Sequence, residues 1–206
     1  MSEEARLLQV ILFGDSSAKK SNIIHKLIHP ESENSIIPQI GSDMGIWRTE
    51  VRNINCKLRI WDTPNLDSRD MGLSYFRGSK GILIVFSITN RQSFDTARNN
   101  ILKAQQFAED GTVVMLVGDR PDFEGERAVT SQEACGLSKQ HNIFYTETNS
   151  YTGDGIELLF KSLAMKMLNI NDRKPNPIHI TPDSLDNGRS KISEFFSRIF
   201  KRRPRT

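Results

Sequence analysis

A seven-residue apolar run, Leu7–Phe13, leads directly into the stretch Gly-Asp-Ser-Ser-Ala-Lys-Lys-Ser at residues 14–21, and an amphipathic segment follows over residues 23–28. Strand, loop and helix in this order match the phosphate-loop pattern G-x-x-x-x-G-K-[ST], whose backbone amides and helix N-terminus face phosphate. Lys20 and Ser21 are in register, but Lys19 stands where the pattern has its second glycine. The predicted phosphate-binding residues are Gly14, Asp15, Ser16, Ser17, Ala18, Lys19, Lys20, Ser21 and Asn22.

Short apolar runs alternate with helical patterns along most of the chain. Leu7–Phe13, Gly81–Ser87 and Val113–Val117 are continuous and apolar, as in strands that are buried on both faces of a parallel sheet. Apolar stripes over residues 94–108, 134–138 and 156–167 predict helices, and the second of them opens with a capping box, Thr130-Ser-Gln-Glu133. Alternation over residues 47–51 and 57–61 predicts an antiparallel hairpin. We therefore expect an α/β doubly wound sheet with one antiparallel edge.

The composition fits an ordinary globular chain. Charged residues make up 26% of it and hydrophobic residues 37%, and the net charge of +3 is too small to predict a nucleic-acid-binding surface. Cys56 and Cys135 have neither metal-site spacing nor a disulfide framework around them, which favours a reducing, intracellular compartment. No apolar run reaches the length of a membrane span, and the N-terminus lacks a signal-peptide pattern.

Five further stretches resemble the Ras superfamily of small GTPases, and the Rab branch in particular. They are Lys-Leu-Arg-Ile-Trp-Asp-Thr at 57–63, Ser-Tyr-Phe-Arg-Gly at 74–78, Ser-Ile-Thr-Asn-Arg-Gln-Ser-Phe at 87–94, Gly-Asp-Arg-Pro-Asp at 118–122 and Glu-Thr-Asn-Ser at 147–150. The last two stand where the family has N-K-x-D and E-T-S-A. The resemblance implies a P-loop small G domain, with a six-stranded, mostly parallel sheet, one antiparallel edge strand and helices on both faces.

The resemblance also implies roles for single residues, with GTP or GDP and Mg²⁺ as cofactors. Lys20 would contact the β- and γ-phosphates, and Ser21 and Asp62 would hold the metal ion. The guanine-binding residues would be Asp119, Arg120, Asp122, Asn149 and Ser150, with Asp122 selecting guanine and a backbone amide near Ser150 meeting the guanine oxygen. Met44, Trp61 and Tyr75 would face Rab-type effectors or regulators.

Several departures from the family pattern fall on the same site. Gln39 stands where the family has a magnesium-binding threonine, and Leu66 stands at the water-orienting position, so that no catalytic residue is assigned. Asp119 replaces an asparagine, and we considered that its carboxylate pairs with Lys19. Lys20 and Asp62 could also be an ordinary surface lysine and strand-end carboxylate. Whether the chain is an enzyme is left open; an active chain would be a slow GTPase.

The C-terminal part differs in composition from the rest. We expect a G domain over residues 1–170, a linker over 171–189 and a basic amphipathic helix over 190–206. Its membrane-facing residues would be Ile192, Phe195, Phe196, Ile199 and Phe200. No cysteine follows Cys135, so no prenyl anchor is expected. The helix could instead fold back on the domain or dock in a partner groove.

Two functions follow from these expectations. The first is a Rab-like GTP- or GDP-binding switch in membrane traffic, with weak or absent hydrolysis, acting as a cytoplasmic monomer on the cytosolic face of intracellular membranes. The second is a nucleotide-free pseudo-GTPase, an interaction module for Rab effectors or regulators. Binding of GDP alone lies between the two.

Overall fold

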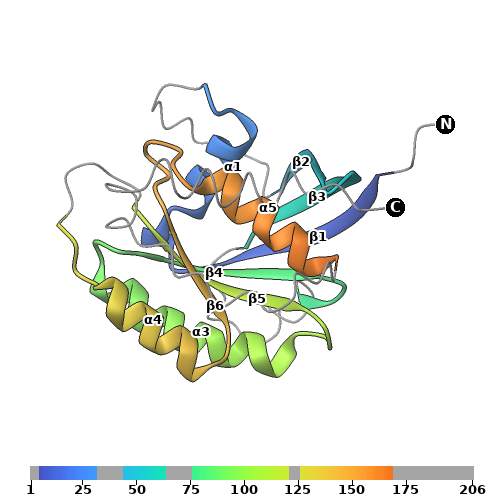
Figure 1. Cartoon of the computed structure of the whole chain (residues 1–206). Coiled ribbons are helices and arrows are strands. Elements are labelled where there is room, and N and C mark those ends of the chain that lie inside the picture. The colour runs from blue at the N-terminus through green and yellow to red at the C-terminus, as the bar shows by residue number, and fades with distance from the viewer. Residues whose placement is uncertain (1–4, 32–43, 64–75, 121–125, 169–206) are drawn as a thin grey trace.

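The computed structural model of the chain describes residues 5–31, 44–63, 76–120 and 126–168. Within them lie six strands and four α-helices (Figure 1). The strands are β1 (Arg6–Gly14), β2 (Met44–Val51), β3 (Ile54–Asp62), β4 (Gly81–Ser87), β5 (Val113–Asp119) and β6 (Phe144–Thr148). The helices are α1 (Lys20–Ile28), α3 (Arg91–Phe107), α4 (Ser131–Gln140) and α5 (Ile156–Met167), and a short 3₁₀ turn, Ser16–Ala18, precedes α1.

The strands form one sheet in the order β2-β3-β1-β4-β5-β6, in which only the β2–β3 pair is antiparallel. This confirms the predicted α/β sheet with one antiparallel edge. β2 and β3 are joined through Arg52 and Asn53, both with positive φ, of 51° and 62°. Two such residues match the right-handed twist of the flanking strands, so the predicted hairpin closes in its tightest common form.

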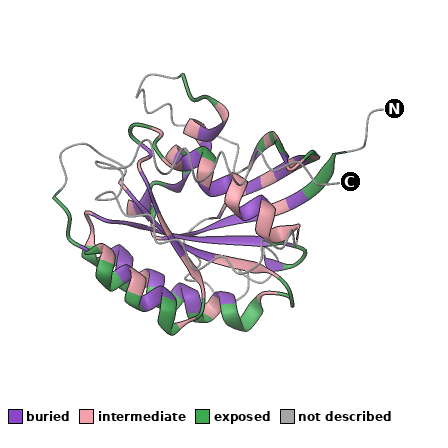
Figure 2. Ribbon diagram, viewed as in Figure 1, coloured by how far each residue is buried: buried purple, intermediate pink, exposed green. Residues whose placement is uncertain are grey.

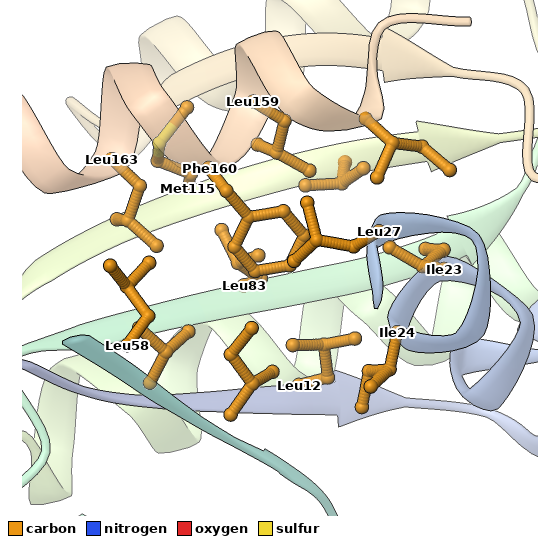
Figure 3. Packing of buried hydrophobic residues seen from close by; sticks show 14 of the residues in the cluster. Leu12, Ile23, Ile24, Leu27, Leu58, Leu83, Met115, Leu159, Phe160 and Leu163 are labelled. Carbon is orange, nitrogen blue, oxygen red and sulfur yellow. The ribbon is translucent and has the colours of Figure 1, made fainter. Parts of the chain in front are cut away.

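The sheet is buried on both faces, as its apolar strands predict. All seven residues of β4 are buried (Figure 2). On one face α1 and α5 cover a core centred on Phe160, Leu83 and Leu58 (Figure 3). On the other face α3 and α4 cover a second core, in which the rings of Phe86 and Phe94 meet with centroids 4.9 Å apart. The helices therefore lie on both faces, as expected.

The predicted capping box at the start of α4 is confirmed. Thr130 accepts a hydrogen bond from the amide of Glu133, and the Glu133 carboxylate accepts one from the amide of Thr130, which completes the capping box of α4. Asn90 caps α3 in a similar way through Ser93. No helix among the described residues is long and apolar enough to span a bilayer.

β1, β3, β5 and β6 run parallel, so their carboxyl ends lie along one edge of the sheet. Ligands of open α/β sheets bind outside these ends. The predicted linker and C-terminal helix, residues 171–206, lie outside the described residues, as do Gln39, Leu66, Asp122 and Tyr75.

Candidate nucleotide site

The phosphate loop begins where β1 presses against β4. A Cβ atom added to Gly14 would lie 2.1 Å from the carbonyl oxygen of Val85, so only glycine fits at this position. The loop then turns through residues 15–18, and the Asp15 carboxylate accepts a hydrogen bond of 2.8 Å from the amide of Ser17. Hydrogen bonding at Ser17, together with the nearby Lys20 ammonium and the Ser16 backbone, holds the pKa of the Asp15 carboxyl below its usual value.

Lys19 adopts the backbone conformation that the pattern reserves for glycine. Its φ and ψ are 44° and 48°, the left-handed region, and its side chain is exposed. A side chain disfavours this region by roughly 1–2 kcal/mol. The loop therefore adopts the left-handed conformation at residue 19 although that residue is lysine, and the lysine side chain extends to solvent.

Lys20 is not a surface lysine. Its residue is only 6% exposed, and its Nζ donates a hydrogen bond of 2.8 Å to the carbonyl oxygen of Gly14 and one of 3.4 Å to that of Asp15. Burial lowers the pKa of the Lys20 ammonium, against the opposing attraction of Asp62 and Asp15. The ammonium is thus held inside the loop, 3.9 Å from the Asp62 carboxylate.

The two predicted metal ligands lie next to each other. The Ser21 hydroxyl donates a hydrogen bond of 2.5 Å to the Asp62 carboxylate at the end of β3. The next residue, Thr63, fixes this strand end by donating through Oγ1 to the carbonyl oxygen of Leu12, at 2.6 Å. A hydroxyl and a carboxylate are hard oxygen ligands, and Mg²⁺ is usually bound through one or two carboxylates together with phosphates. The donor set therefore fits Mg²⁺.

Asp119 closes the end of β5 with a fully buried carboxylate. It accepts hydrogen bonds from Thr148 Oγ1 at 2.7 Å, from the Ser150 amide at 3.0 Å and from Ser150 Oγ at 2.5 Å. Burial raises the pKa of the Asp119 carboxyl to about 6 in spite of these donors. The suggested pairing with Lys19 is wrong, because the Lys19 side chain is exposed and the Asp119 carboxylate is bonded to the loop after β6.

The predicted guanine-binding residues that the structure describes lie at the carboxyl ends of β5 and β6: Asp119 and Arg120 at the first, Asn149 and Ser150 at the second. Asn149 accepts hydrogen bonds of 3.0 Å from the amides of Tyr151 and Thr152, so its side chain is used within its own loop. The backbone amide of Arg120 donates to the carbonyl oxygen of Thr148 at 3.0 Å, which links the loops after β5 and β6.

A hydrogen-bond network around the buried Glu147 was not predicted. Glu147 accepts hydrogen bonds from both Arg127 Nη atoms, at 3.1 and 2.7 Å, from Tyr145 Oη at 2.6 Å and from Ser131 Oγ at 2.8 Å. Burial and the nearby Glu147 raise the pKa of the Tyr145 phenol. The network ties α4 to the end of β6. A glutamate within the Glu-Thr-Asn-Ser stretch was the only signal in the sequence, and its partners are distant along the chain.

Two of the three residues predicted to face effectors lie among the described residues. Met44 and Trp61 lie opposite each other on β2 and β3, and both are half-buried. Tyr75, the guanine-selecting Asp122, Leu66 and the five apolar residues predicted to face a membrane lie outside the described residues. Among the described residues no three His, Cys, Asp or Glu side chains gather as a metal-binding group.

Comparisons with known proteins agree with this geometry. The model of the Ras family matches residues 9–169. Ras-related protein Rab-4A of Danio rerio is 30% identical over 164 residues, which cover 79% of this chain and 77% of that protein. Ras-related protein Rab-4 of Dictyostelium discoideum and Ras-related protein Rab-13 of Mesocricetus auratus are each 29% identical, over 87% of this chain and 89% of theirs.

Proposed function

The chain belongs to the Ras family and is a Rab-like small GTPase, and from this premise we propose that it binds GDP or GTP with Mg²⁺ and acts as a switch in membrane traffic. The observation that carries the proposal is the buried Lys20 ammonium beside the Ser21–Asp62 pair. Burying an ammonium is unfavourable unless its charge has partners, and Lys20 is buried among two carbonyl oxygens and the Asp62 carboxylate, where the outer phosphates would be its further partners.

Each residue of the phosphate site has a physical role in this proposal. The left-handed backbone at Lys19 begins α1 at Lys20, which points the first amides of the helix toward the loop. Lys20 supplies a point charge to the outer phosphates, and Ser21 and Asp62 hold Mg²⁺, which would neutralise charge on the β- and γ-phosphates. Hydrolysis is weak or absent, because Leu66 has no polar group with which to orient a water molecule.

The base site supports a second candidate, a pseudo-GTPase that binds no nucleotide. The Ser150 amide, which would meet the guanine oxygen, donates instead to the Asp119 carboxylate at 3.0 Å. Guanine presents acceptors along its O6 and N7 edge. A buried anion beside that edge opposes guanine binding unless the carboxyl is protonated. In this second function the chain is an interaction module for Rab effectors or regulators.

The nucleotide content of the purified protein separates the two functions. The protein is denatured and its supernatant is run on anion exchange. Stoichiometric GDP or GTP is the expected result. An empty protein that also fails to bind added GDP or GTP with Mg²⁺ would overturn the first function in favour of the second.

Two serines of the phosphate loop give a matched pair of variants. Ser21→Ala removes the metal-binding hydroxyl, and we expect it to lose most of the Mg²⁺-dependent part of nucleotide affinity. Ser16→Ala changes an exposed side chain whose predicted role is played by its backbone, so its affinity should stay within about twofold of the parent. Equal losses in the two variants would contradict the assignment of Ser21 as a metal ligand.

A further inference from the structure

At the sheet edge formed by β2, β3 and β1, one face carries cationic and apolar side chains that lie outside the two hydrophobic cores. Because residues directly opposite in neighbouring strands share a face, the register defines two rows of three. The first row is Ile46, Arg59 and Gln9, and the second is Arg48, Lys57 and Leu7. We call these six residues the basic face. A third row, containing Trp61 and the buried Ile11, joins it to the core under α3.

The three cations of the basic face have no counter-ion among the residues that the structure describes. Within the part of the chain that the structure describes, Arg48, Lys57 and Arg59 take part in no ion pair. Glu50 lies one row further toward the hairpin turn, opposite Asn55. Three cations on adjacent positions repel one another. An anionic partner would offset this repulsion, which favours its binding.

Apolar exposure accompanies the charge. Leu7 is 53% exposed and Ile46 is 37% exposed, and they lie on the two flanks of the face. Two buried N–H groups also have no acceptor among the described residues: the Nε of Arg59 in the basic face and the Nε1 of Trp61 in the row beside it. Each residue as a whole is half-exposed, so a partner that uncovers these N–H groups could supply the acceptor that each one lacks.

We propose that the basic face docks an acidic protein segment that alternates carboxylate with apolar side chains. Guanidinium and ammonium donors in fixed rows on a sheet face suit carboxylate and carbonyl oxygens at matching positions. An anionic membrane would fit the basic face less well, because its apolar residues are two separated side chains rather than one protruding cluster. The proposal rests on the prediction that Met44 and Trp61 face a protein partner, which both proposed functions share, and it does not require bound nucleotide.

The two tryptophans give a built-in test. Trp61 borders the basic face, whereas Trp47 packs on the opposite face, against Phe160. The full chain, labelled with ¹⁵N, is titrated with a peptide that alternates glutamate and leucine. We expect the indole N–H resonance of Trp61 to move and that of Trp47 to stay. Peptides alternating lysine with leucine and glutamate with serine should bind more weakly, and added salt should weaken binding.

Charge reversal supplies the matched variants. Arg48→Glu with Arg59→Glu should reduce peptide affinity about tenfold, the effect of losing two surface ion pairs. The control is Arg98→Glu with Lys139→Glu, the same charge change at exposed positions of α3 and α4, and it should leave affinity within about twofold. The thermal midpoint of each variant is measured, and Arg48→Gln with Lys57→Gln replaces the first pair if that pair unfolds.

Three outcomes would overturn the proposal. They are equal effects of the two double variants, equal movement of both indole resonances, and a Trp61 response to phosphatidylserine vesicles but not to the acidic peptide. The nucleotide content of the same samples is measured in parallel. Peptide binding by an empty protein would leave this inference standing while the proposed nucleotide function failed, and a nucleotide-loaded protein that ignores the peptide would do the reverse.

Discussion

At the scale of single residues, Asp119 combines a buried charge with a position in the base site. Its folded pKa of about 6 lies above the ordinary value of 3.8, so the folded state binds the proton more tightly than the unfolded state does. Stability therefore falls as the pH rises from 3.8 to about 6, and the full penalty remains above that window. Two pKa units correspond to about 3 kcal/mol.

Asp119→Asn should stabilise the protein above pH 6, by up to about 3 kcal/mol, because the amide can accept from the Ser150 amide without carrying charge. The gain should shrink as the pH falls through the window and vanish below it. Urea unfolding at several pH values measures this. A gain that does not depend on pH would show that the carboxylate charge is not its cause.

Lys19 is the second residue that the fold holds against its preference. Lys19→Gly should raise the free energy of unfolding by about 1 kcal/mol, because glycine adopts the left-handed conformation without a Cβ clash. Asn53→Gly is the control, since Asn53 has φ 62° but asparagine tolerates this region well. The two urea midpoints are compared, and an equal or larger gain for the Asn53 variant would contradict the argument.

At the scale of elements, α4 depends on its first turn. Thr130→Ala removes the capping hydroxyl and should lower stability by about 1 kcal/mol, because a helix amide loses its acceptor. Gln132→Ala changes an exposed residue in the same turn and should have little effect. Thermal unfolding of both variants distinguishes capping from general sensitivity of α4, and equal shifts would refute the role of the cap.

Local sequence patterns predicted most of the strands and helices, because the apolar runs, alternation and apolar stripes that specify them lie within each element. Apolar runs gave β1, β4 and β5, and alternation gave the hairpin. No local pattern predicted β6, which only the family resemblance implied: its five residues, Phe-Tyr-Thr-Glu-Thr, mix apolar and polar side chains, and Glu147 is buried with bonds from Arg127, Ser131 and Tyr145. The predicted Lys19–Asp119 pairing was wrong because it, too, depended on contacts between distant parts of the chain. Two loops at one sheet edge are neighbours, but backbone direction decides which side chains meet.

At the scale of the whole molecule, the predicted membrane attachment belongs to residues 190–206. A chain ending at residue 189 should lose most of its binding to anionic liposomes, because each lysine or arginine near such a surface contributes about 1 kcal/mol. Vesicle sedimentation measures this binding. The controls are neutral vesicles and a variant with serine in place of the five apolar residues Ile192, Phe195, Phe196, Ile199 and Phe200. Equal sedimentation of the full and shortened chains would reject the prediction.

The tight turn at Arg52 and Asn53 also sets the order in which the molecule assembles. β2 and β3 are neighbours along the chain, so their pairing closes a two-residue loop within microseconds. The parallel pairs join strands that are far apart, such as Leu7 with Lys57, and must first close long loops. The ribbon that carries Ile46 and Arg59 can therefore form while the chain is otherwise unfolded. The phosphate and base loops come together only when β1, β5 and β6 are in place, so nucleotide binding is among the last properties that refolding restores.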